Sequence, residues 1–182
     1  MANRVCPWWM AYTFDHPLRK LLQSPEKILG PYLEQGMTVL DLGCGMGFFS
    51  IAMAEMIGAG GRVIAVDLQP QMLEVLRARA EKKGVGDRII TRACKPESLD
   101  VTERVDFALA FYMVHEVPDK GAFLAQVAAS LKPGAKFLLI EPGMHVSPAC
   151  FNETIELAGK TGLRPIGSPR IRLSRTCLFK AG

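Results

Sequence analysis

The chain has 182 residues, 49% of them hydrophobic and 22% charged, a composition typical of a soluble globular protein with one core. No apolar run approaches the roughly 20 residues of a membrane helix and no signal-peptide pattern opens the chain, so we expect a cytoplasmic protein without a membrane span. Five scattered cysteines without a Cys-x-x-Cys pair argue against a disulfide framework and a structural zinc site, and we expect no metal ion.

The chain opens with an aromatic arm over residues 1–24. This arm contains the side chains Trp8, Trp9, Tyr12, Phe14 and His16. Ser24-Pro25 then predicts a helix N-cap with proline in the first turn. The apolar spacing that follows continues this helix through Leu33 to near Gly36.

Short apolar runs and helical patterns alternate along most of the remaining chain. The expected strands are residues 37–42, 62–67, 88–93, 104–111 and 135–141. Helical patterns begin near Met46 and cover residues 70–83, 119–132 and 152–160, with Asp119 as an N-cap and Pro133-Gly134 as a stop. Such alternation predicts βαβ units, and hence a doubly wound α/β domain whose mostly parallel sheet carries helices on both faces.

The C-terminal segment interrupts this alternation. Strand patterns at 163–166 and 176–180 have no helix between them, so they must form an antiparallel hairpin. The segment is also basic, because from Leu157 onward it has no acidic residue and six basic ones: Lys160, Arg164, Arg170, Arg172, Arg175 and Lys180. Arg170 and Arg172 alternate with apolar residues as on the solvent face of an edge strand, and no aromatic residue lies among them, which argues against a nucleic-acid partner.

Three glycines follow the first expected strand, in the stretch DLGCGMGFFS. A backbone without Cβ atoms at a helix N-terminus lets a ligand approach closely. Twenty residues after Gly47 the second strand ends at Asp67, where a carboxylate can accept both hydroxyls of a ribose. A dinucleotide fingerprint would need a third glycine where Phe48 stands, and Asp41 would repel a pyrophosphate but attract an ammonium group. The pattern favours a nucleoside that carries a zwitterionic amino acid.

Four motifs in register then carry a resemblance to a known family. The stretches VLDLGCGMGFFSIAMA, VIAVDLQPQML, VDFALAFYMVHEVPD and LKPGAKFLLIEP resemble the ordered motifs of class I S-adenosylmethionine-dependent methyltransferases over about residues 25–182. The chain looks most similar to the small-molecule group that includes ubiquinone/menaquinone-biosynthesis-like and arsenite-methyltransferase-like enzymes. The resemblance implies a single methyltransferase domain over 1–182, with the arm over 1–24, a Rossmann-like core over 25–182 and a seven-stranded sheet.

The resemblance also implies a cofactor, S-adenosyl-L-methionine, with S-adenosyl-L-homocysteine as its product. The first motif would hold the methionine moiety, Asp67 the ribose and Leu68 the adenine, and the carbonyl of Phe111 would accept from the ammonium group. The residues expected at the cofactor are Asp41, Gly43, Cys44, Gly45, Gly47, Asp67, Leu68, Cys94, Lys95 and Phe111.

The adenine contact departs from the family pattern. The family often has Asp-Ala after the third strand, whereas this chain has Lys95-Pro96. A charged lysine cannot accept a hydrogen bond and proline has no N–H to donate. We therefore expect the adenine to be held by backbone groups of Cys94 or Lys95, or by Glu97.

The candidate catalytic residues follow the fourth strand. His115 lies where a general base would meet the acceptor, and Glu116 would orient it or act itself; alternatively, His115 only packs a loop. At the end of the fifth strand, Glu141 would bind the substrate or stabilise a turn. The arm supplies the remaining candidate substrate and lid residues, which are Trp9, Tyr12, Phe14 and His16. Their side chains would exclude water from the site, or would simply pack on the core.

The fourth strand also limits the choice of acceptor. It ends in Phe-Tyr-Met-Val, without the Asn/Asp-Pro-Pro-Tyr/Phe motif of amino-group methyltransferases or the Pro-Cys of cytosine methylation. A small-molecule acceptor is the resulting prediction, with the methylated atom and the oligomeric state left open. Two alternatives remain, a non-catalytic S-adenosylmethionine-binding module and an RNA methyltransferase that uses the basic C-terminal hairpin.

Overall fold

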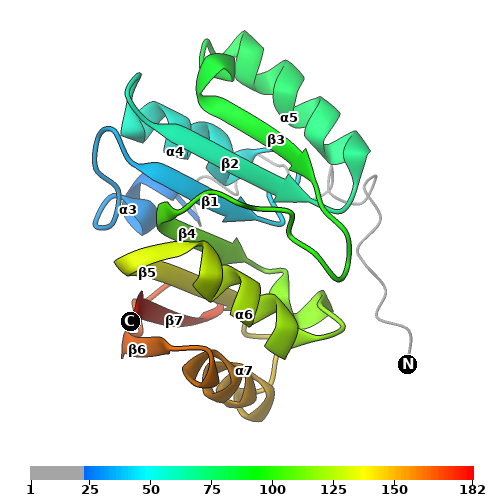
Figure 1. Cartoon of the computed structure of the whole chain (residues 1–182), viewed down its shortest axis with the longest axis vertical. Coiled ribbons are helices and arrows are strands. Elements are labelled where there is room, and N and C mark those ends of the chain that lie inside the picture. Colours follow the sequence, from blue (N-terminus) through cyan, green and yellow to red (C-terminus); the bar gives the residue numbers. More distant parts are fainter. Residues whose placement is uncertain (1–22) are drawn as a thin grey trace.

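The computed structural model describes residues 23–182, which form one seven-stranded sheet with helices on both faces (Figure 1). The arm residues Trp8, Trp9, Tyr12, Phe14 and His16 lie outside the described residues, so their role stays a prediction. The strands are β1 Thr38–Leu42, β2 Arg62–Asp67, β3 Ile89–Ala93, β4 Val105–Phe111, β5 Leu131–Pro142, β6 Leu163–Gly167 and β7 Ser174–Ala181. The helices are α3 Pro25–Leu29, α4 Phe48–Ile57, α5 Pro70–Lys82, α6 Lys120–Ser130 and α7 Pro148–Lys160, with 3₁₀ turns η2 Gly86–Arg88 and η3 Val114–Glu116.

The sheet has the order β3-β2-β1-β4-β5-β7-β6. The first five strands are parallel, whereas β7 pairs antiparallel with both β5 and β6. The predicted doubly wound α/β class, the seven strands and the C-terminal hairpin are therefore confirmed. From β1 the chain forms β2 and β3 on one side, and it then crosses to the other side of β1 to form β4. This reversal creates a switch point between β1 and β4.

Helices cover both faces of the sheet (Figure 1), and the core lies in two layers, one on each face. Side chains of α6 and α7 pack on one face and side chains of α3, α4 and α5 on the other. Consecutive residues of β1, such as Val39 and Leu40, are both fully buried but belong to opposite layers. A strand covered on both faces must be apolar throughout, which explains the continuous apolar runs in the sequence.

Several elements differ in their bounds from the sequence prediction. Helix α7, predicted over residues 152–160, begins at Pro148, with Ser147 as its N-cap. The first helix ends at Leu29 instead of near Gly36, because Pro31 has no N–H for a helical hydrogen bond. The fifth strand begins at Leu131, directly after α6, and a register irregularity opposite Val105–Phe107 accommodates the residues before Lys136.

Among residues 23–182, no helix is long and apolar enough to cross a bilayer.

A further difference concerns residues 170–173, which form a loop and not the solvent face of an edge strand. The edge strand β6 ends at Gly167, and Pro169 cannot donate to a further ladder bond. Two side chains fix the loop instead: Ser168 Oγ donates to the carbonyl of Thr176 at 2.8 Å, and Thr176 Oγ1 donates to the carbonyl of Pro169.

Candidate active site

The candidate site lies at the carboxyl ends of β1, β2, β4 and β5, where the order of the sheet changes direction. In open α/β sheets this edge is where ligands bind. The glycine turn follows β1, Asp67 ends β2, Phe111 ends β4 and Glu141 is the penultimate residue of β5. Parallel pairing therefore brings together most of the site residues that the sequence predicted.

The glycine turn has the left-handed backbone that its sequence requires. Gly43, Gly45 and Gly47 have φ angles of 66°, 53° and 85°, a region that other residues rarely adopt. A Cβ on Gly47 would lie 2.7 Å from Cγ of Leu76, so this glycine also allows α5 to pack closely. A Cβ on Gly45 would meet nothing within 4 Å, which leaves an open backbone surface where the expected cofactor fits.

Asp67 is anchored by two backbone N–H groups. Gly45 N–H donates to Oδ2 and Gln69 N–H donates to Oδ1, both at 2.9 Å. Burial raises the pKa of this carboxyl above its usual value, and the backbone hydrogen bonds oppose that shift. A carboxylate has about four lone-pair sites, so acceptor capacity remains for ribose hydroxyls. Asp67 thus fits its expected role while it also ties β2 to the glycine turn.

Asp41 is more deeply placed than a direct cofactor contact would suggest. The residue is 2% exposed, and Ser50 Oγ of α4 donates to its Oδ2 at 2.5 Å. We expect Asp41 to act on the ammonium group mainly through its charge. The Ser50 contact was not foreseen from the sequence, although Ser50 lies within the first turn of the helix after the glycines.

In the turn after β3, the backbone N–H groups that could have bound the adenine already donate hydrogen bonds within the chain. Cys94 N–H donates to the carbonyl of Asp67 at 3.0 Å, and Lys95 N–H donates to the carbonyl of Ser98 at 2.9 Å. Both N–H groups already have partners within the chain, and Pro96 has none to give. The carbonyls and side chains of this turn, together with the half-buried Leu68, remain as candidate adenine contacts.

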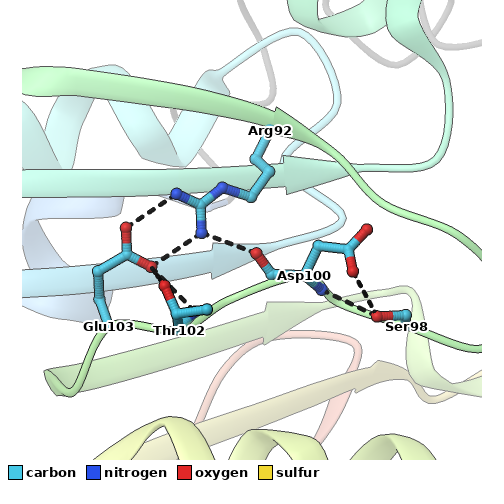
Figure 2. Close-up of polar contacts among 5 residues, drawn as sticks. All are labelled: Arg92, Ser98, Asp100, Thr102 and Glu103. Carbon is cyan, nitrogen blue, oxygen red and sulfur yellow. Dashed lines mark hydrogen bonds and ion pairs between the residues drawn. The ribbon is translucent and has the colours of Figure 1, made fainter.

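An ion pair holds the base of this turn in place. Figure 2 shows Arg92 of β3 directed at both carboxylate oxygens of Glu103, each at 2.8 Å, and at the carbonyl of Asp100. The hydrogen bonds from Arg92 lower the pKa of Glu103 to about 2. Asp100 has a φ of 51°, and its side chain accepts from Ser98 Oγ at 2.6 Å. The segment after β3 is therefore fixed to the sheet by side chains and not by a strand ladder.

His115 and Glu141 form the main polar pair of the site. The His115 Nδ1–H donates to Oε2 of Glu141 at 2.5 Å, and the N–H of Val114 donates to Oε1 at 2.8 Å. Glu141 is 2% exposed, so both oxygens of a buried carboxylate have partners. The hydrogen bond from His115 to Glu141 raises the pKa of His115 above its usual value, against the opposing effect of burial.

The carboxylate that contacts His115 Nδ1 differs from the one that the sequence analysis expected to orient the ring. Glu116, expected to orient the ring, lies 3.9 Å from Nε2, whereas Glu141, expected at the substrate or in a turn, contacts Nδ1. Nδ1 is therefore the nitrogen held by Glu141, and the Glu116 carboxylate lies 3.9 Å from Nε2. The partly exposed ring belongs to η3 and the buried carboxylate to β5, so their contact depends on the pairing of β4 with β5 and on the path of the turn after β4.

Tyr112 is a further candidate site residue, which the sequence analysis did not identify. It follows Phe111 with a φ of 58°, and its hydroxyl shares a hydrogen bond of 2.6 Å with the hydroxyl of Ser174. Gln23 Nε2 also donates to this phenol, at 3.1 Å. Backbone strain in a non-glycine residue is concentrated at functional sites. A tyrosine directly after an expected strand was the available signal in the sequence.

The two cysteines near the site carry neutral thiols. Burial raises the pKa of Cys44 well above its usual value and that of Cys94 to about 11. A thiolate is the nucleophilic and metal-binding form, so neither side chain is activated near neutral pH. Within residues 23–182, no group of three His, Cys, Asp or Glu side chains is arranged to hold a metal ion.

Comparison with known proteins extends these observations. A family model described as a methyltransferase domain matches residues 33–161. The ubiquinone biosynthesis O-methyltransferase of Xanthomonas axonopodis pv. citri is 32% identical over 152 residues, which is 83% of this chain. The aligned region is 60% of that protein, so the chain spans less than two thirds of the length of this relative.

Solved structures share the fold at lower sequence identity. A methyltransferase from Aquifex aeolicus, dependent on S-adenosylmethionine, is 23% identical with a TM-score of 0.87, covering 98% of this chain and 100% of the other. An O-methyltransferase from Thermotoga maritima, dependent on the same cofactor, is 16% identical with a TM-score of 0.69, covering 87% and 64%. Identities this low establish a common fold and leave substrate questions to the site itself.

Proposed function

The chain belongs to the class I S-adenosylmethionine-dependent methyltransferases, and we propose that it moves a methyl group to a hydroxyl of a small-molecule acceptor. The observation that carries the proposal is the His115–Glu141 pair at the same sheet edge as the glycine turn. The name of the Xanthomonas relative, an O-methyltransferase, agrees with a hydroxyl acceptor.

The residues that would hold the cofactor form two groups. Gly45 would offer a bare backbone to the methionine moiety, in a turn that Gly43 and Gly47 allow to pack against Met113 and Leu76. Asp67 would offer its carboxylate to the ribose. When bound, S-adenosylmethionine supplies a methyl group on a positively charged sulfur. The rings of Phe49, in the first turn of α4, and Phe111, at the end of β4, are both buried, and their centroids lie 4.5 Å apart.

His115 would act as the general base. An alcohol or phenol loses its proton as the new bond to carbon forms, and a positioned imidazole can accept it at Nε2. Glu141 would be a positioning residue, because its carboxylate keeps the other ring proton on Nδ1 and stabilises the imidazolium that results. Proton transfer of this kind contributes roughly 10²- to 10⁴-fold to rate.

The experiment that tests this function begins with binding. Asp67→Ala should weaken S-adenosylhomocysteine binding by about 100-fold or more in calorimetry, since two ribose hydrogen bonds to a charged group, each worth about 1.5–3 kcal/mol, are lost. A wild-type chain should then release S-adenosylhomocysteine when incubated with S-adenosylmethionine and a panel of phenols, catechols and aliphatic alcohols.

Three outcomes would contradict the proposal. Unchanged affinity in Asp67→Ala, with retained fold by circular dichroism, would remove the cofactor assignment. Binding without turnover across the panel would favour a non-catalytic binding module. Turnover that requires RNA would favour the RNA methyltransferase alternative.

A further inference from the structure

A groove lies between α7 and the loop that joins β6 to β7, close to the candidate active site. Its volume is about 800 Å³, within the range of small-molecule sites. We call it the α7–loop groove; its apolar lining includes Phe151, Ile155, Pro165 and Ile171. Neither the glycine turn nor the His115–Glu141 pair contributes to this lining, so the groove is separate from the expected cofactor site.

The α7–loop groove is strongly basic. Arg170, Arg172 and Arg175 all line it, and none of its lining residues is acidic. Within residues 23–182 no ion pair involves Arg170 or Arg172, and both are exposed. The Arg175 Nε–H donates to the carbonyl of Val146 at 2.7 Å, which holds this side chain in place. Unpaired guanidinium groups above an apolar surface fit a ligand with an anionic group and an apolar body.

One end of the groove adjoins the proposed base. Arg175 of β7 is the register partner of Glu141 of β5, and Ser174 is the partner of Pro142. Directly opposed residues in antiparallel strands have Cα atoms about 4.5–5.5 Å apart. The groove therefore starts one strand away from the carboxylate that contacts His115, a separation that a small organic molecule can span.

We propose that the α7–loop groove binds the carboxylate or phosphate of the methyl acceptor, while the hydroxyl of the same molecule reaches His115. This inference rests on the proposed function and adds the chemical class of the acceptor, an amphipathic organic anion. Phe151 is only 6% exposed, so the groove offers no open aromatic surface for stacked bases, and a small anion fits it better than a nucleic acid.

The test compares charged and neutral probes on the full chain. Isothermal titration at low ionic strength would use 4-hydroxybenzoate, its neutral counterpart 4-hydroxybenzamide, and phenyl phosphate, each in the presence of S-adenosylhomocysteine. We expect at least one anionic probe to bind about tenfold more tightly than the amide. The preferred anion distinguishes a carboxylate from a phosphate.

Variants identify the groups that hold the anion. Arg170→Gln with Arg172→Gln should weaken the preferred anion about tenfold or more and leave the amide unchanged. Lys160→Gln with Arg164→Gln is the matched control, because it removes the same charge from exposed residues outside the groove. This control should bind the anion like the wild type.

Several results would overturn the inference. Equal affinity for anion and amide, equal weakening in both double variants, or no binding of either anionic probe up to about 10 mM would each do so. Tight binding of a short single-stranded RNA that is lost in Arg170→Gln/Arg172→Gln would assign the groove to nucleic acid instead. If all variants bind S-adenosylhomocysteine with unchanged affinity, their cofactor site is intact. A failure of the groove inference is then distinguished from a failure of the proposed function.

Discussion

Glu141→Gln is the most direct perturbation of the proposed active site. The substitution preserves size and one acceptor oxygen but removes the charge that His115 Nδ1–H contacts at 2.5 Å. The remaining oxygen can accept from Val114 N–H, as Oε1 does now, so we expect the fold to persist. The substitution should therefore affect mainly the orientation and the basicity of the His115 ring.

The size of the effect follows from this contact. A hydrogen bond to a charged group contributes about 1.5–3 kcal/mol. If the variant loses this stabilisation of the protonated His115 ring in the transition state, the rate falls tenfold for each loss of about 1.36 kcal/mol. The expected decrease in kcat is therefore about 10- to 150-fold. The melting temperature should change by only about 2–4 °C for each kcal/mol lost in a chain of this size.

The pH profile supplies the diagnostic measurement. Glu141 raises the pKa of His115 above the ordinary 6.5, so the wild-type activity should rise with pH only through a midpoint above that value. In Glu141→Gln the imidazole loses its proton more easily, so the acid limb of kcat/KM should move to lower pH. A kcat within twofold of wild type, or an unmoved acid limb, would refute the assignment of Glu141 as the residue that positions His115.

Two further predictions concern stability. Gly47→Ala should cost about 2–4 kcal/mol, because a left-handed φ and a contact with Leu76 both oppose a Cβ, and thermal melting should show a decrease of roughly 5–15 °C. Glu103→Gln should cost about 0.5–1 kcal/mol at neutral pH, since the pair with Arg92 is partly exposed. Because the pKa of Glu103 is lowered to about 2, this contribution is complete above its ordinary value of 4.5 and is lost as pH falls toward 2.

Each stability prediction has its own control. Gly159→Ala lies in α7 with no atom within 4 Å of the added Cβ, so it should be neutral or slightly stabilising. Equal melting of the two alanine variants would contradict the packing argument for Gly47. For Glu103→Gln, urea titrations at several pH values should show the difference from wild type closing in acid, and a difference that persists at pH 2 would contradict the ion-pair explanation.

The accuracy of the sequence prediction varied with the range of the interactions involved. β2 was predicted to the residue, and α5 to within one residue, because a buried strand and an amphipathic helix each leave a periodic pattern in adjacent residues. The first helix was overestimated because apolar spacing continued beyond Pro31. Residues 170–173 were misassigned because alternation in a short basic segment does not require a strand partner.

Residues close together in the chain were enough to predict the α/β class, the glycine turn, the position of Asp67 at the end of the second strand, and the family resemblance. The contact between His115 and Glu141, which are 26 residues apart, could be seen only in three dimensions. The same is true of the hydrogen bonds that already occupy the N–H groups of Cys94 and Lys95, and of the position of Arg170, Arg172 and Arg175 around one groove. Contacts of this kind depend on strand register and loop path, which many distant residues determine jointly.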